Sequence, residues 1–206
     1  MLELREISCH RGDRKLFGEL SLSVLPGGVL SVEGRNGSGK TTLLRALCGL
    51  TALDDGKICW QGRDITGQRE HFVAQVMYLG HRNALKDDLS PMENLQASLR
   101  IAGHAITGAA ARSALEAVGL GPAFHQLPTK VLSEGQKRRV ALARLWCDER
   151  PLWVLDEPFT ALDAHSSQLL RQRLQQHVDR KGVVVVATHQ DIGLDPRVIH
   201  QLRLGE

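Results

Sequence analysis

Two segments far apart in the chain carry residue types at spacings suited to phosphate chemistry. The first runs from Gly34 to Thr41, reads GRNGSGKT and fits the pattern G-x-x-x-x-G-K-[ST]. It follows a short apolar run, VLSVEG, and precedes a helix expected from about Lys40 to Gly49. In this setting the glycines let backbone N–H groups turn toward phosphate oxygens, and the helix dipole adds to the attraction. We therefore predict a phosphate site here; the alternative is a glycine-rich turn with a lysine at a helix start.

The residues of this loop have separate predicted roles in holding ATP and Mg²⁺. Lys40 is expected to reach the β- and γ-phosphates and to act in catalysis, while the hydroxyl of Thr41 ligates Mg²⁺. The other predicted nucleotide contacts in the loop are Gly34, Arg35, Asn36, Gly37, Ser38, Gly39 and Thr42.

The second segment places two neighbouring acids, Asp156 and Glu157, directly after the apolar run LWVL. A strand ending there brings both acids to the carboxyl edge of the sheet, where ligands bind in open α/β folds. Asp156 is expected to hold Mg²⁺, partly through water, because magnesium takes few protein carboxylates. Glu157 is expected to polarise the water that attacks the γ-phosphate. The alternative is that the two acids only begin a solvated loop.

Composition limits the class of protein. The chain has 206 residues, 42% of them hydrophobic and 24% charged, as in an ordinary globular domain. The net charge of +3 is too small to indicate nucleic-acid binding. The four cysteines form no C-x-x-C pair, which argues against a zinc site or a disulfide framework and fits a reducing cytosol. No apolar run approaches the roughly 20 residues of a spanning helix, and we expect no apolar signal core at the amino terminus.

Strand-like and helix-like segments alternate along the chain, which predicts an α/β fold with a parallel sheet. Between about Ser90 and Ala117 the apolar residues recur at helical spacing, and Pro91 stands at a predicted helix start. The expected strands are LELREIS, LSLSV, VLSVEG, KICWQG, QVMYLG, LWVLD, VVVVAT and RVIHQLRL, and a further helix is expected across SSQLLRQRLQQHV.

A short polar segment, LSEGQ at Leu132–Gln136, precedes the basic helical run KRRVALARL, and its Ser133 and Gln136 form a capping-box pattern. Together with GRNGSGKT and LDEP, this segment resembles the ATP-binding subunits of ABC transporters. The resemblance implies a P-loop NTPase of ABC type with a RecA-like parallel-sheet core, an antiparallel β lobe and a helical subdomain. It also implies one domain over 1–206, in which 1–81 and 148–206 form the catalytic core with the β lobe and about 82–147 the helical lobe.

The same resemblance assigns roles to further residues. Ser133, Gly135 and Gln136 would bind the γ-phosphate held by the opposite subunit, so catalysis would require two copies of the chain. Asp163, in TALD, would contact the other subunit, and His189, in ATH, would contact the γ-phosphate as a catalytic switch. Glu134 stands where relatives have a glycine, and we do not assign it to the binding site.

Two positions depart from the family pattern. His81 stands where relatives carry a glutamine that senses Mg²⁺ and the transmembrane partner, and the protonation of a histidine is poised near physiological pH. Arg11 aligns with the aromatic residue that stacks on adenine. An arginine plane can stack on a purine, although Arg11 can equally be an exposed residue of a basic turn.

Within the family, the segments WQG, LGH, LARLWCDERPLWVLDEPFTALD and THQ are most similar to the ATP-binding subunits of cytochrome c maturation. That similarity implies a peripheral ATPase on the cytoplasmic face of a bacterial inner membrane, with integral CcmB-like and CcmC-like partners and no nucleic acid. Its work would be haem export or release of a haem-loaded chaperone. The alternatives are the ATPase of another small ABC transporter, such as a lipoprotein-release or cell-division system, and a non-transport ABC protein acting on DNA or ribosomes.

Overall fold

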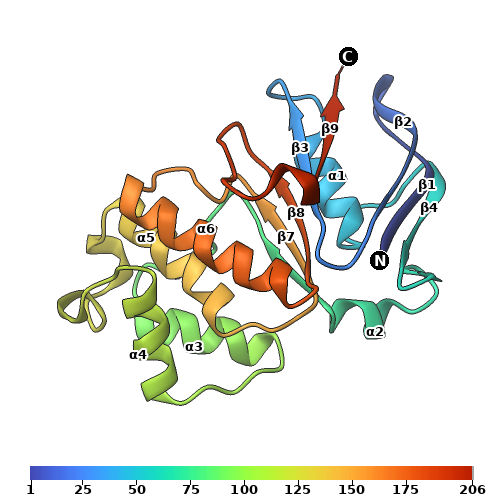
Figure 1. Cartoon of the computed structure of the whole chain (residues 1–206). Helices are drawn as coiled ribbons and strands as arrows, with labels where there is room; N and C mark the ends of the chain where they lie inside the picture. The colour runs from blue at the N-terminus through green and yellow to red at the C-terminus, as the bar shows by residue number, and fades with distance from the viewer. Residues whose placement is uncertain (206) are drawn as a thin grey trace. The chain divides into compact units, whose positions relative to one another are not determined.

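The structure is a computed structural model that describes residues 1–205 (Figure 1). The chain divides into two compact units. The first contains Met1–Tyr78, Arg150–Glu157 and the chain from Gln175 onward, and the second contains Leu79–Glu149 and Pro158–Leu174. Residues 158–174 therefore belong to the second unit, although strands of the first unit flank them in the sequence.

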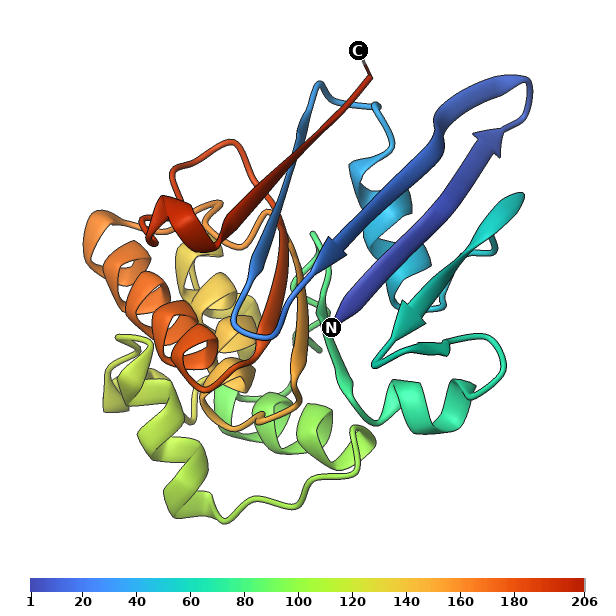
Figure 2. The ribbon, with the colours of Figure 1, turned by 45° about the vertical axis from the view of Figure 1, so that its right-hand side comes forward.

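A five-stranded sheet in the order β6-β7-β8-β3-β9 forms the centre of the first unit (Figure 2). The pairs β7–β8, β8–β3 and β3–β9 are parallel. β7 and β8 are buried along their whole length, which agrees with their unbroken apolar sequences. The strands are β3 (Val29–Gly34), β6 (Val76–Leu79), β7 (Leu152–Asp156), β8 (Val183–Ala187) and β9 (Ile199–Leu204).

A second sheet of four strands, in the order β2-β1-β4-β5, belongs to the same unit. Its neighbours pair antiparallel, and Leu2 of β1 stands opposite Val24 of β2 and Trp60 of β4. The two longest strands extend beyond the predicted apolar segments to the hairpin turn at Gly12 and Asp13. The strands are β1 (Leu2–Arg11), β2 (Arg14–Val24), β4 (Asp55–Trp60) and β5 (Arg63–Asp64).

One hydrophobic core joins the two sheets to helix α1 (Lys40–Leu47), which packs against β3, β7 and β8. Leu43, Leu44 and Leu47 are fully buried on the inner face of the helix. The helix ends at Leu47 rather than at the predicted Gly49, because Gly49 adopts a left-handed backbone with φ 67°. The Leu50 N–H then donates to the Arg45 carbonyl at 2.8 Å, which closes the helix end.

The second unit is helical and contains α3 (Pro91–Ile101), α4 (Gly108–Ala117) and α5 (Glu134–Leu142). Helix α3 begins where Pro91 predicts it, with a capping box between Ser90 and Glu93. The predicted helical stretch is interrupted after Ile101 and resumes at Gly108, where Thr107 caps the helix. The unit also contains three short 3₁₀ segments, η1 (Pro122–Phe124), η2 (Thr129–Val131) and η3 (Ala143–Trp146), and the part of helix α6 (Ala164–Asp179) up to Leu174.

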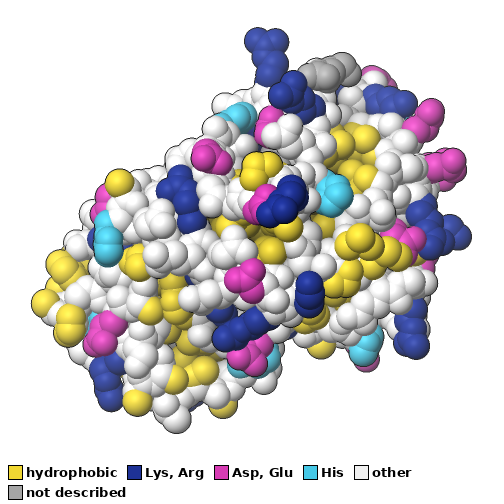
Figure 3. All heavy atoms as spheres, in the orientation of Figure 1, with side chains coloured by type: hydrophobic (Ala, Val, Ile, Leu, Met, Phe, Trp, Pro, Cys, Tyr) yellow, Lys and Arg dark blue, Asp and Glu magenta, His cyan; other side chains and the backbone are white. Residues whose placement is uncertain are grey.

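Five short elements have no counterpart in the sequence prediction: β5, helix α2 (Arg69–Val73) and the 3₁₀ turns η1, η2 and η4 (Pro196–Val198). Helix α6 (Ala164–Asp179) covers the predicted SSQLLRQRLQQHV segment, and the α/β fold class with parallel core, antiparallel lobe and helices is confirmed. Among residues 1–205, no helix is both long and apolar enough to cross a membrane. Basic and acidic side chains are interspersed on the face in Figure 3, as the small net charge suggests.

Candidate functional site

The loop between β3 and α1 turns through backbone conformations that glycine alone adopts easily. Gly37 has φ 80° and Gly39 has φ 102°, both in the left-handed region. No atom lies within 4 Å of where a Cβ of Gly37 would stand, so this turn borders open space. The loop can therefore approach a ligand closely with its backbone.

The first turn of α1 offers N–H groups without competition from its own side chains. Gly39 is the N-cap and supplies no side-chain cap, and the first turn contains no acidic residue. The orphan N–H groups and the positive end of the helix dipole both favour an anion at this position. The start of α1 therefore has the free N–H groups and the dipole orientation that a phosphate-binding helix N-terminus requires.

Ser38 adds a buried polar atom to the loop. Its residue is 5% exposed, and its Oγ has no hydrogen-bond partner in the protein. A buried hydroxyl without a partner is costly, and an acceptor oxygen of a bound phosphate would satisfy it.

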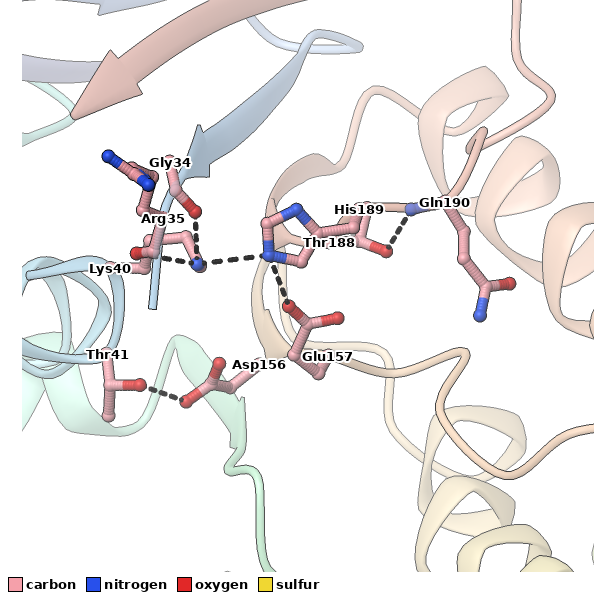
Figure 4. A network of polar contacts seen from close by, with 9 residues as sticks. All are labelled: Gly34, Arg35, Lys40, Thr41, Asp156, Glu157, Thr188, His189 and Gln190. Carbon is pink, nitrogen blue, oxygen red and sulfur yellow. Dashed lines mark hydrogen bonds and ion pairs between the residues drawn. The ribbon is translucent and has the colours of Figure 1, made fainter. Parts of the chain in front are cut away.

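Lys40 lies among polar atoms although its residue is only 8% exposed. Its Nζ donates to the Gly34 carbonyl at 2.5 Å and to the Arg35 carbonyl at 3.3 Å, and lies 3.2 Å from Nε2 of His189 (Figure 4). The ammonium group is thus held at the mouth of the phosphate loop, facing the end of β8.

Thr41 and Asp156 form a pair of oxygen ligands suited to magnesium. Thr41 Oγ1 donates to Asp156 Oδ2 at 2.8 Å, and Asp156 is 2% exposed at the end of β7. Hard cations such as Mg²⁺ take oxygen ligands and keep several waters and phosphate oxygens. Within residues 1–205 no three His, Cys, Asp or Glu side chains gather into a metal site.

Glu157 occupies a strained position beyond Asp156. Its φ is 49°, which a non-glycine residue rarely adopts, and its N–H donates to the Ala187 carbonyl of β8 at 2.8 Å. Its Oε1 lies 3.8 Å from Nε2 of His189 (Figure 4). The ends of β7 and β8 therefore bring Glu157 and His189 together beside Lys40, at the edge of the sheet where the phosphate loop also lies.

Ser133, Gly135, Gln136 and Asp163 all lie in the second unit. The predicted capping box is present at the start of α5: Ser133 Oγ accepts from the Gln136 N–H at 3.2 Å, and Gln136 Oε1 accepts from the Ser133 N–H at 2.8 Å. A Cβ on Gly135 would stand 2.7 Å from the Ala161 carbonyl, so glycine is needed for the approach to the TALD loop.

Charged residues around α5 are paired within the same unit. Asp163 is exposed, and the pKa of its carboxyl is lowered by hydrogen bonds from the Ser166 backbone and side chain. Arg139 Nη1 lies 3.6 Å from Asp163 Oδ2 and links α5 to the TALD loop. Glu134 is exposed and pairs with Lys137 at 3.3 Å.

His81 and Arg11, the two departures from the family pattern, are both exposed. His81 lies in the irregular segment between β6 and α3, and Arg11 stands opposite Arg14 at the β1–β2 turn. His10, beside Arg11, is oriented by a contact of 3.1 Å between its Nδ1 and Asp54 Oδ2. Hydrogen bonds from His10 lower the pKa of Asp54. No local pattern predicts this pair, because 44 positions separate its members.

Comparison with known proteins agrees with this geometry. The family model described as ABC transporter matches residues 17–160, from β2 to beyond Glu157. This chain belongs to the ABC transporter family. ABC transporter proteins named "Cytochrome c biogenesis ATP-binding export protein CcmA" are similar to it over its length. The relative from Dechloromonas aromatica is 45% identical, covering 100% of both chains, and that from Aromatoleum aromaticum is 50% identical, covering 93% of this chain and 89% of its own.

Solved ABC transporter structures share the fold. A putative ABC transporter ATP-binding protein from Pyrococcus furiosus has a TM-score of 0.83 at 25% identity, covering 98% of this chain and 96% of its own. A dimeric ATP-binding cassette bound to ADP and Pi has a TM-score of 0.80 at 23% identity, covering 100% of this chain and 97% of its own. The predictions of an ABC-type ATPase and of its fold are confirmed.

Proposed function

We propose that this chain hydrolyses ATP at a site completed by a second copy of itself, and that it thereby drives a membrane complex for cytochrome c maturation. The observation that carries the ATPase site is the convergence of Lys40, Asp156, Glu157 and His189 on the carboxyl edge of one sheet. The observation that carries the cytochrome c assignment is the 45% identity, over the whole of both chains, to a cytochrome c biogenesis protein.

The loop from Gly34 to Thr42 would hold the phosphates of ATP through its backbone N–H groups, with Lys40 on the β- and γ-phosphates. Thr41 and Asp156 would hold Mg²⁺, partly through water, and the metal neutralises charge that develops on the transferred phosphoryl group. Arg11 would lie against the adenine base. The contacts to the phosphates and to Mg²⁺ would use donors and acceptors at the carboxyl edge of the five-stranded sheet, whereas Arg11 belongs to the four-stranded sheet.

Glu157 would orient and polarise the attacking water, and His189 would contact the γ-phosphate. The strained backbone of Glu157 supports this role, because such strain persists where the surrounding structure fixes a functional side chain. Lys40 and the ring of His189 would hold the γ-phosphate next to this water, which would orient the reacting groups.

Ser133, Gly135 and Gln136 would bind the γ-phosphate of the ATP held by the second copy, with the start of α5 directing its dipole at the phosphate. Asp163 would contact the second copy. His81 would face Mg²⁺ and the transmembrane partner. Two ATP molecules then stabilise the dimer, and hydrolysis releases it.

The partners would be integral CcmB-like and CcmC-like proteins, which would hold the chain on the cytoplasmic face of a bacterial inner membrane. The coupled work would be haem export or the release of a haem-loaded chaperone. The chain itself supplies hydrolysis and a change of shape, and we assign haem contacts to its partners.

Deletion of the gene in its own host tests this function. We expect the deletion strain to lose c-type cytochromes with covalently attached haem. The wild-type chain should restore them, and the Lys40→Ala chain should not.

The tagged chain should also co-purify with integral membrane proteins in MgATP. Intact c-type cytochromes with a defect in lipoprotein release or cell division would assign the chain to another transporter, and co-purification with DNA or ribosomes would reject a transport role.

A further inference from the structure

A buried arginine, Arg138 on helix α5, joins three segments of the second unit. Its residue is 3% exposed. Its Nε donates to the Pro158 carbonyl at 3.3 Å, and its Nη1 donates to the Gly80 carbonyl at 3.3 Å and to Asn83 Oδ1 at 3.1 Å. Burial of a charged guanidinium group is costly, and acceptors for its Nε–H and its Nη1–H groups offset that cost.

The three segments are those that carry functional residues. Gly80 and Asn83 lie on either side of His81, and Pro158 follows Glu157 directly in the chain. Arg138 itself lies on the helix that begins after Ser133. One side chain therefore connects the His81 segment, the backbone beyond Glu157 and helix α5.

The residue after Pro158 is also held in place. Phe159 is 1% exposed, and Arg171 lies over its ring at 5.3 Å from the centroid. A displacement of Pro158 therefore requires the surrounding structure to move with it, because close-packed interiors transmit strain. Such a segment can pass a displacement on to its neighbour in the chain.

We propose that Arg138 is a positioning residue that moves the backbone beyond Glu157 together with the His81 segment. This role rests on the proposed function, in which a membrane partner acts on His81. A partner that shifts the His81 segment pulls on Gly80 and Asn83, and Arg138 transmits that shift to the Pro158 carbonyl. The position of Glu157, and with it the rate of hydrolysis, then depends on the partner.

Hydrogen exchange in the full chain tests the connection without reference to ATP turnover. Asn83→Ala removes an acceptor for Arg138 in the His81 segment only. Arg138→Lys keeps the positive charge but replaces the planar guanidinium group, with its several N–H donors, by a single ammonium group. We expect both variants to raise the exchange of amides 159–162 by about tenfold, the effect of losing one charge-assisted hydrogen bond. The matched control is Arg173→Lys, which alters another buried arginine, 7% exposed, whose Nε donates to the Leu145 carbonyl at 2.8 Å.

ATP turnover of the chain in its membrane complex supplies the second measurement. We expect Arg138→Lys and Asn83→Ala to lower kcat about tenfold, while the Kd for ATP stays within about twofold of wild type, because the phosphate loop lies in the other unit. Arg173→Lys should change neither. Unchanged exchange at 159–162 in both test variants would overturn the role of Arg138, whereas a wild-type chain without ATP turnover would contradict the proposed function instead.

Discussion

The ammonium nitrogen of Lys40 lies 3.2 Å from Nε2 of His189, although 149 positions separate the two residues. An ammonium group only donates hydrogen bonds, so Nε2 is the acceptor in this contact. The same Nε2 lies 3.8 Å from Glu157 Oε1. The phosphate loop and the ends of β7 and β8 thus meet through one imidazole nitrogen.

Lys40→Ala should lower ATP turnover by a factor on the order of a hundred or more, because it removes a charge-assisted contact to the phosphates. The measurement is steady-state phosphate release. Lys57→Ala, which changes an exposed lysine on β4, should leave the rate unchanged. Equal rates for wild type and Lys40→Ala would remove the phosphate loop from the proposed site.

The neighbouring acids should respond differently to amide substitution. Glu157→Gln keeps the shape of the side chain but removes its charge, so MgATP should still bind, turnover should fall by a factor on the order of a hundred, and the ATP-bound dimer should accumulate. Asp156→Asn weakens the metal site, so the Mg²⁺-dependent affinity for ATP should fall and no stable dimer should form.

Gel filtration in MgATP and single-turnover hydrolysis distinguish the two acids. The control is Glu33→Gln, since Glu33 lies near the end of β3 and pairs with Arg203 at 3.5 Å. Its dimerisation and turnover should match wild type. A trapped dimer in Asp156→Asn together with lost metal dependence in Glu157→Gln would reverse the assigned roles.

Ser133→Arg should block hydrolysis while the isolated chain still binds ATP, because Ser133 is proposed to act on nucleotide held by the second copy. Fluorescent-nucleotide binding and turnover are measured on the same preparation. Thr107→Arg removes a comparable N-cap, at α4 of the same unit, and should leave turnover near wild type. Loss of ATP binding by the Ser133→Arg monomer would contradict the two-copy geometry.

Gly182→Ala should destabilise the protein by about 1–3 kcal/mol, because a Cβ at this position would overlap the His177 ring. That ring cannot yield easily, since it stacks on Trp153 with ring centroids 3.7 Å apart. Urea denaturation measures the loss. Gly67→Ala is the control, because the nearest atom to its Cβ would be 3.9 Å away. Equal free energies of unfolding for the two variants would show that the His177 ring moves aside at no cost, and would contradict this prediction.

Much of the molecule follows from residues that are close together in the sequence. The phosphate loop depends on glycines and a helix start within one short segment, and the capping boxes at Ser90 and Ser133 depend on partners three residues away. The buried strands β7 and β8 can be predicted from the sequence, because each is an unbroken apolar run apart from Asp156 at the end of β7. Such local patterns determine which elements form and where the phosphate loop and the two acids stand along the chain.

Only the tertiary structure decides which distant residues meet. Hydrophobic periodicity shows which face of an element is buried but not what lies against it. The contacts of Lys40 with His189, of His10 with Asp54 and of Arg138 with Pro158 therefore have no signature in the sequence. The left-handed backbone of Glu157 is likewise decided by the packing around the end of β7, because isolated glutamate does not favour that conformation.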